Sequence, residues 1–155
     1  MGKLVMRRSA ADNEYLHKDF HGALSNGIEY LHETYGPEAV REYLRQFVRS
    51  YYAPLREQIT ARGLEALKEH FERMYAVEGG SVRIEMGGDT LTLHVERCPA
   101  VTHLRESGYK VARMFNETSR TVNEALVEGT PFEAEMPDYD DATGHSTQIF
   151  RRRAA

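Results

Sequence analysis

The sequence predicts an α+β fold, in which a helical N-terminal half packs on a small antiparallel sheet formed by a β-hairpin and C-terminal strands. A change of hydrophobic period supports this. Up to about residue 79 the apolar residues recur at three- and four-residue spacing, whereas beyond residue 80 they alternate with polar ones. A chain of 155 residues fits one hydrophobic core. We therefore expect a single domain over 1–155, with its core at about 12–152 and loose termini.

Glycine and proline mark the ends of three expected helical segments in the first half. The first runs from Asp12 to Tyr35, where Gly36 ends it and Pro37 begins the next. A further helix follows Gly63 and ends near residue 79. The second segment carries the clearest amphipathic stripe, which we expect to be buried: Val40, Tyr43, Leu44, Phe47, Val48 and Tyr51.

The second half contains a predicted hairpin, two short helices and two more strands. Alternation on both sides of the turn residues Gly87-Gly88-Asp89 predicts the hairpin over Ser81 to Arg97. An isolated hairpin is only marginally stable, so further strands are expected to complete a sheet. The other expected elements are helices at Pro99 to Ser107 and Met114 to Leu126, strands at Phe132 to Met136 and Thr147 to Arg152, and an acidic loop at Pro137 to Thr143.

Composition excludes several classes of function. The net charge is −4, and the basic clusters Arg7-Arg8 and Arg151-Arg152-Arg153 lie at the two ends, so no basic face for nucleic acid is expected. No apolar run is long enough to cross a bilayer. Cys98 is the only cysteine, so no intramolecular disulfide can form. We expect a cytoplasmic protein that binds neither nucleic acid nor membrane; a homo-oligomer stays open.

Cys98 is the first candidate for chemistry. If Pro99 is the first helical residue, Cys98 occupies the N-cap, where backbone N–H groups and the helix dipole stabilise a thiolate. The neighbouring Arg97 acts in the same direction. The alternative is that a lone intracellular cysteine is a small buried hydrophobe, because desolvation raises a thiol pKa.

Histidines form the second group of candidates. His17 and His21 lie four residues apart on the first helix, a spacing that suits a metal site or a proton relay but also two locally hydrogen-bonded side chains. His145 follows Gly144 at the start of the last strand, from which a side chain can reach a cleft. The sequence has no phosphate-binding glycine loop, nucleophile elbow or zinc-protease motif. The cofactor and the metal are unknown at this stage.

The segment Tyr15 to Tyr35, the run Arg97-Cys98-Pro99 and the glycine-started final strand together resemble the L-2-amino-thiazoline-4-carboxylic acid hydrolase-like family. The resemblance spans roughly Tyr15 to Arg152. It implies hydrolytic opening of a small C–N-containing ring derived from cysteine. In the final helix and strand, where many relatives carry extra cysteines, this chain has Asn116 and Glu117 in the helix and His145 near the start of the strand.

These observations predict a hydrolase that acts on a C–N bond of a small polar substrate, either cyclic and cysteine-derived or amidine-like. Cys98 would attack or orient the electrophilic carbon, and His17 or His145 would act as general base and then acid. The expected substrate-binding residues are His21, Tyr43, Tyr52, Asn116 and Glu117. Two alternatives stay open: a small-molecule-binding or sensor module without catalysis, and a metal-dependent hydrolase that uses His17 and His21.

Overall fold

Four helices precede the first strand in the computed structural model, which describes residues 19–155. The helices are α1 (Asp19–Tyr35), α2 (Pro37–Tyr51), α3 (Ala53–Arg62), α4 (Leu64–Glu78), α5 (Pro99–Glu106) and α6 (Glu117–Val127). The strands are β1 (Ser81–Gly87), β2 (Thr90–Arg97), β3 (Phe132–Tyr139) and β4 (Ser146–Arg152). Among these helices, none combines the length and the apolar character needed to span a membrane.

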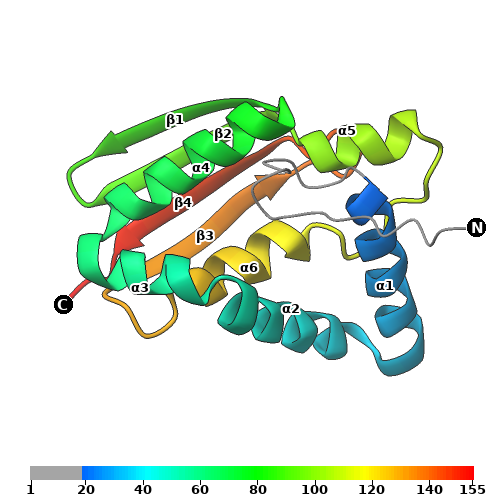
Figure 1. Ribbon diagram of the computed structural model, residues 1–155, viewed down its shortest axis with the longest axis horizontal. Coiled ribbons are helices and arrows are strands. Elements are labelled where there is room, and N and C mark those ends of the chain that lie inside the picture. Colours follow the sequence, from blue (N-terminus) through cyan, green and yellow to red (C-terminus); the bar gives the residue numbers. More distant parts are fainter. Residues whose placement is uncertain (1–18) are drawn as a thin grey trace, which may run out of the picture.

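The four strands form one antiparallel sheet in the order β1-β2-β4-β3 (Figure 1). The predicted hairpin is β1 and β2, in which Met86 lies opposite Leu91. The last strand, β4, inserts between β2 and β3, and its Phe150 pairs with Leu91. The α+β prediction is therefore confirmed, with a helical first half and an antiparallel sheet completed by C-terminal strands.

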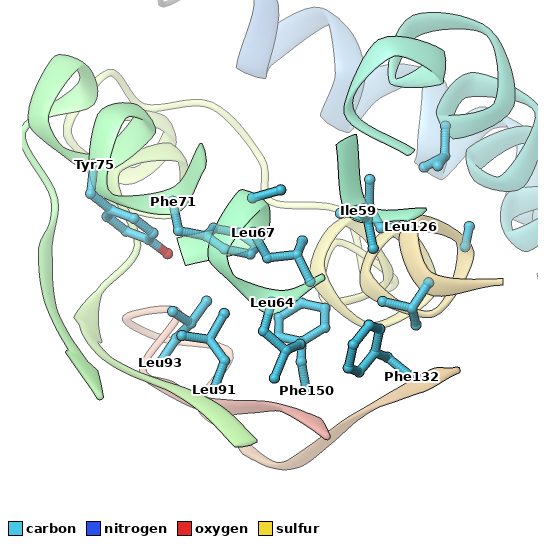
Figure 2. Packing of buried hydrophobic residues seen from close by; sticks show 14 of the residues in the cluster. Ile59, Leu64, Leu67, Phe71, Tyr75, Leu91, Leu93, Leu126, Phe132 and Phe150 are labelled. Atoms are coloured by element: carbon cyan, nitrogen blue, oxygen red, sulfur yellow. The ribbon is translucent and has the colours of Figure 1, made fainter. Parts of the chain in front are cut away.

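Helices cover one face of this sheet and form the larger core with it (Figure 2). Alternate residues of β2 point into the core, and so does Phe150 at the centre of the sheet. Their partners come from α3, α4 and α6, with Leu67 of α4 fully buried among them. The core members labelled in Figure 2 are Ile59, Leu64, Leu67, Phe71, Tyr75, Leu91, Leu93, Leu126, Phe132 and Phe150.

A second buried cluster joins α1 and α2 to α5 and the segment that follows it. Ile28 of α1 and Leu44 of α2 pack with Val101 and Leu104 of α5. Ser25 fixes the same junction, because its hydroxyl donates to the carbonyl oxygen of Lys110 at 2.9 Å and accepts the N–H of Ala112 at 2.9 Å. The N-terminal helix is thereby attached to residues more than 80 positions along the chain.

Two predicted boundaries are wrong. Part of the expected acidic loop belongs to β3, which continues to Tyr139 through an irregular register between Glu135 and Asp138. Pro137 is tolerated there because β3 is an edge strand, where proline need not donate to a neighbour. The last helix begins at Glu117 rather than Met114, after a turn. The expected first helix from 12 to 18 lies outside the described residues.

The amphipathic stripe of α2 is only half buried, contrary to the prediction. Val40, Leu44 and Val48 are inaccessible, but Tyr43 and Tyr51 are 45% and 59% exposed. The aliphatic row points straight at the core, and the aromatic row lies on the adjacent strip of the helix surface. An apolar stripe that is wider than the contact surface leaves its margin in solvent.

The position of Phe47 between these two rows leads to a graded stability prediction. Phe47 is half buried and stacks on Tyr51, with ring centroids 5.1 Å apart. Phe47→Ala is expected to lower the free energy of unfolding by about 1–2 kcal/mol, less than the 3–5 kcal/mol of a full core truncation. Tyr43→Ala, at the exposed margin, should cost less than about 0.5 kcal/mol. Urea unfolding of both variants measures the difference, and equal losses would contradict this arrangement of α2.

Candidate functional site

A cavity of about 230 Å³ lies where the end of α4 meets the beginnings of β1 and α5. The start of α1 lies beside α5 and closes one side of this region (Figure 1). The lining is mostly polar and comes from segments far apart in the sequence. The polar and titratable side chains that line the cavity are His21, Glu78, Ser81, Arg97, Thr102, His103 and Glu106.

A carboxylate and two imidazoles converge on this cavity. Nε2 of His21 lies 3.8 Å from Oε2 of Glu78, and both side chains are largely buried. Burial raises the pKa of Glu78, since desolvation disfavours the charged carboxylate. The rings of His21 and His103 are 6.4 Å apart between centroids. Nε2 of His103 is buried and has no hydrogen-bond partner among the described residues. Side chains that can give or take a proton therefore face one small space.

Cys98 occupies the N-cap of α5, as the sequence predicted, with an extended backbone (φ −76°, ψ 122°). Its N–H donates to the carbonyl oxygen of Thr143 at 3.2 Å, which places the residue beneath the loop between β3 and β4. Burial raises the pKa of the Cys98 thiol, and the N–H groups of Ala100 and Val101 act in the opposite direction. Desolvation outweighs the helix terminus here, so the sulfur is held mainly as a thiol.

The two predicted catalytic residues that the structure describes, Cys98 and His145, do not lie at this cavity. His145 has an exposed side chain whose Nδ1 lies 3.6 Å from Oδ2 of Asp138 on the neighbouring strand β3. His17 lies outside the described residues. A catalytic role for each of these three residues stays a prediction.

The predicted substrate-binding residues are spread over several regions. His21 lines the cavity, whereas Tyr43 is exposed on α2 and Tyr52 lines a different, smaller cavity. Asn116 and Glu117 lie at the beginning of α6. Of the five residues, only His21 lies at the cavity described above.

Glu117 forms a buried hydrogen bond and an ion pair at the start of α6. Its Oε2 accepts the hydroxyl of Thr121 at 2.6 Å, and its Oε1 lies 3.5 Å from Nε of Arg41. The side chain is almost completely buried. A carboxylate at the N-terminus of a helix with a cationic partner stabilises α6 and its contact with α2.

Sequence reasoning missed Glu78 and His103. Glu78 is the last residue of α4, immediately before Gly79 and Gly80, and His103 lies one turn into the helix that Pro99 begins. The sequence does place Glu78 at the expected junction between a helix and a strand, and a titratable residue at such a junction could have been proposed as a site residue. Their proximity depends on how α1, α4 and α5 pack, and no local spacing in the sequence reports that.

Metal binding has no support within the described range. Over residues 19–155, no group of three or more His, Cys, Asp or Glu side chains is arranged to hold a metal ion. The predicted metal pair needs His17, which lies outside that range. Zinc sites use three or four protein ligands, so His21 and Glu78 alone do not make one. The metal-dependent alternative stays a prediction.

Comparison with known proteins does not place the chain in a family. No protein-family model matches it, and no curated protein sequence matches it. The resemblance to the L-2-amino-thiazoline-4-carboxylic acid hydrolase-like family stays a prediction that rests on the short motifs around Tyr15, Cys98 and Gly144.

Proposed function

We propose that the protein is a hydrolase that cleaves a C–N bond of a small polar substrate bound in the cavity of His21, Glu78 and His103. The observation that carries the proposal is the convergence of these three titratable side chains from three different helices. A volume of about 230 Å³ is below the usual range of pockets for drug-sized ligands, so it suits a small substrate. The lone cysteine supports a cytoplasmic location as part of the same proposal.

The proposed reaction uses water as the nucleophile. A neutral imidazole, from His21 or His103, takes a proton from water as its oxygen bonds to the electrophilic carbon. The raised pKa of Glu78 increases the fraction of protonated carboxyl, which can give its proton to the departing nitrogen as the C–N bond breaks. The imidazolium then returns its proton to Glu78 through one water, since 3.8 Å between Nε2 of His21 and Oε2 of Glu78 is too long for direct transfer, and both groups regain their starting forms.

The charges of the cavity support an amidine-like substrate. Glu106, which lines the same cavity and takes no part in the proposed proton transfers, complements a cationic amidinium, and Arg97 complements an acidic substituent on the same molecule. Hydrogen bonds to the buried imidazole of His103 would satisfy a nitrogen that has no partner among the described residues. These interactions agree with the substrate class that the family resemblance implies.

Hydrolysis can be tested with 2-amino-thiazoline-4-carboxylic acid and with simple cyclic amidines, by mass spectrometry of a product that has gained one water. Glu78→Gln keeps the shape of the side chain but loses its proton chemistry, and should lower kcat/KM about 100-fold. The matched control is Glu85→Gln, since Glu85 lies 3.3 Å from Nε2 of His94 outside the cavity. The control should keep the wild-type rate. Full activity of Glu78→Gln would contradict the assigned role.

A binding module without catalysis is the second candidate. The 3.8 Å between Nε2 of His21 and Oε2 of Glu78 favours it, because this separation is longer than a direct hydrogen bond and leaves no preformed path for proton transfer between the two side chains. Under this alternative the same compounds would bind and be recovered unchanged. Glu78→Gln would weaken binding, and no product with an added water would form. Isothermal titration run beside the mass-spectrometric assay separates the two candidates.

A further inference from the structure

A second cavity, of about 80 Å³, lies between α4 and α6 and reaches the buried face of β4. It shares no lining residue with the first cavity. Its polar side chains are Tyr52, His70, Thr118, Ser119, Asn123 and Gln148, and the rest of its wall is largely apolar. A single water needs about 10–15 Å³ on this measure, so the space holds about five waters or one small organic molecule.

Two carboxamides are held in fixed orientations at the base of this cavity. Nδ2 of Asn123 donates to Oε1 of Gln148 at 2.6 Å, and Nε2 of Gln148 donates to Oγ of Ser146 at 3.1 Å. The chain of bonds links α6 to β4 and fixes the orientation of both carboxamides. The carbonyl oxygen of Asn123 receives no hydrogen bond from the described residues and remains an acceptor.

The wall of the cavity carries no charge at neutral pH. Burial lowers the pKa of His70 to about 4, so its imidazole is neutral. Burial also raises the pKa of Tyr52 to about 12, so its hydroxyl keeps its proton. The two rings meet edge to face with centroids 5.5 Å apart. An ion that entered would lose its hydration without meeting an opposite charge, whereas a neutral polar molecule would exchange hydrogen bonds with the wall.

We propose that this cavity is a binding site for a small uncharged primary amide. The amide N–H₂ would donate to the carbonyl oxygen of Asn123, and the neutral imidazole of His70 would pair with the polar end of the same group. A short alkyl tail would lie against the apolar part of the wall, where Met74 and Val122 are exposed to the cavity. The site is independent of the proposed hydrolysis at the first cavity.

The test uses propionamide as the probe and propionate and propylammonium as ions of similar size. Chemical shifts of ¹⁵N-labelled protein are followed during each titration. Propionamide should give saturable shifts at the backbone amides of Ser119 and Asn123, and both ions should bind at least tenfold more weakly. Binding of an ion as tight as that of the amide would overturn the proposal. The absence of any saturable shift would mean that the cavity holds water only, which also overturns it.

Two variants place the binding at this cavity. Ser119→Leu fills the space from α6 and should weaken propionamide binding at least tenfold, whereas Ser50→Leu, at an exposed serine of α2, should leave it unchanged. If Ser119→Leu does not fold, His70→Phe keeps a ring of similar shape but removes its hydrogen-bonding nitrogens, and should weaken binding to the same extent. Unchanged affinity in a folded variant would contradict the site. Hydrolysis at the first cavity should be the same in all these variants, so a failure here is distinct from a failure of the proposed function.

Discussion

Gly144→Ala is expected to lower the free energy of unfolding by about 2–5 kcal/mol. Gly144 has φ +70°, a left-handed conformation that costs an alanine about 1–2 kcal/mol. A Cβ atom at this position would overlap Cβ of Cys98 and lie 3.1 Å from Cγ2 of Val101. Cys98 Cβ is attached directly to the backbone that begins α5, so it cannot swing aside, and overpacking adds about 1–3 kcal/mol.

Gly108→Ala is the matched control for this prediction. Gly108 has nearly the same backbone angle, φ +75°, and a Cβ added there has no atom within 4 Å. It should therefore show only the conformational cost of about 1–2 kcal/mol. Urea unfolding of both variants measures the steric part as the difference between them. Equal losses would mean that the loop over Cys98 moves freely, and that the thiol is less enclosed than the close approach of Gly144 indicates.

The parts of the fold that could be predicted are those in which a local signal determines the structure. Alternation on both sides of Gly87-Gly88-Asp89 identified the hairpin, because a two-residue period and a turn sequence are sufficient for it. Cys98 was placed at a helix N-cap by the single fact that Pro99 fits a first helical position. Neither prediction needed knowledge of the rest of the chain.

Other features depend on the width of a packing surface or on the position of a strand in the sheet. Tyr43 and Tyr51 follow the helical period of α2 as well as Leu44 does, yet only the aliphatic row reaches the core. Pro137 suggested a loop, but an edge strand accepts proline. Period and residue type say nothing about which strand lies at an edge or how far a contact extends around a helix.

The candidate site also depends on tertiary packing that no local sequence pattern reports. The sequence singled out His21, and it singled out the run around Cys98 that contributes Arg97 to the rim, so the region was identified in part. It could not show that Glu78, some 57 positions beyond His21, would be its partner. The enclosure of Cys98 beneath the β3–β4 loop, outside the lining of this cavity, follows from tertiary packing alone.

Stability is expected to fall as the pH is lowered from about 7 to about 4, with His70 supplying as much as ~3 kcal/mol of the loss. Burial, and to a smaller extent the nearby charge of Arg73, lower the pKa of His70 from 6.5 to about 4 in the folded protein. Between these two values the unfolded chain binds a proton that the folded protein excludes, so acid favours unfolding. The difference in pKa corresponds to roughly 3 kcal/mol once both states are protonated.

The contribution of His70 is isolated by comparing pH profiles of unfolding free energy. His70→Phe and His70→Gln both lack the titrating group, the first with the ring retained and the second with a hydrogen-bonding side chain retained. Each is expected to lose less stability than the wild type between pH 7 and 4, whatever its stability at pH 7. Carboxylates that titrate in the same range, such as Glu29 with its pKa lowered by Arg113, affect wild type and variants alike. If both variants keep the full wild-type pH dependence, the pKa of His70 is not lowered in the folded protein, which would contradict the burial of its imidazole in the wall of the second cavity.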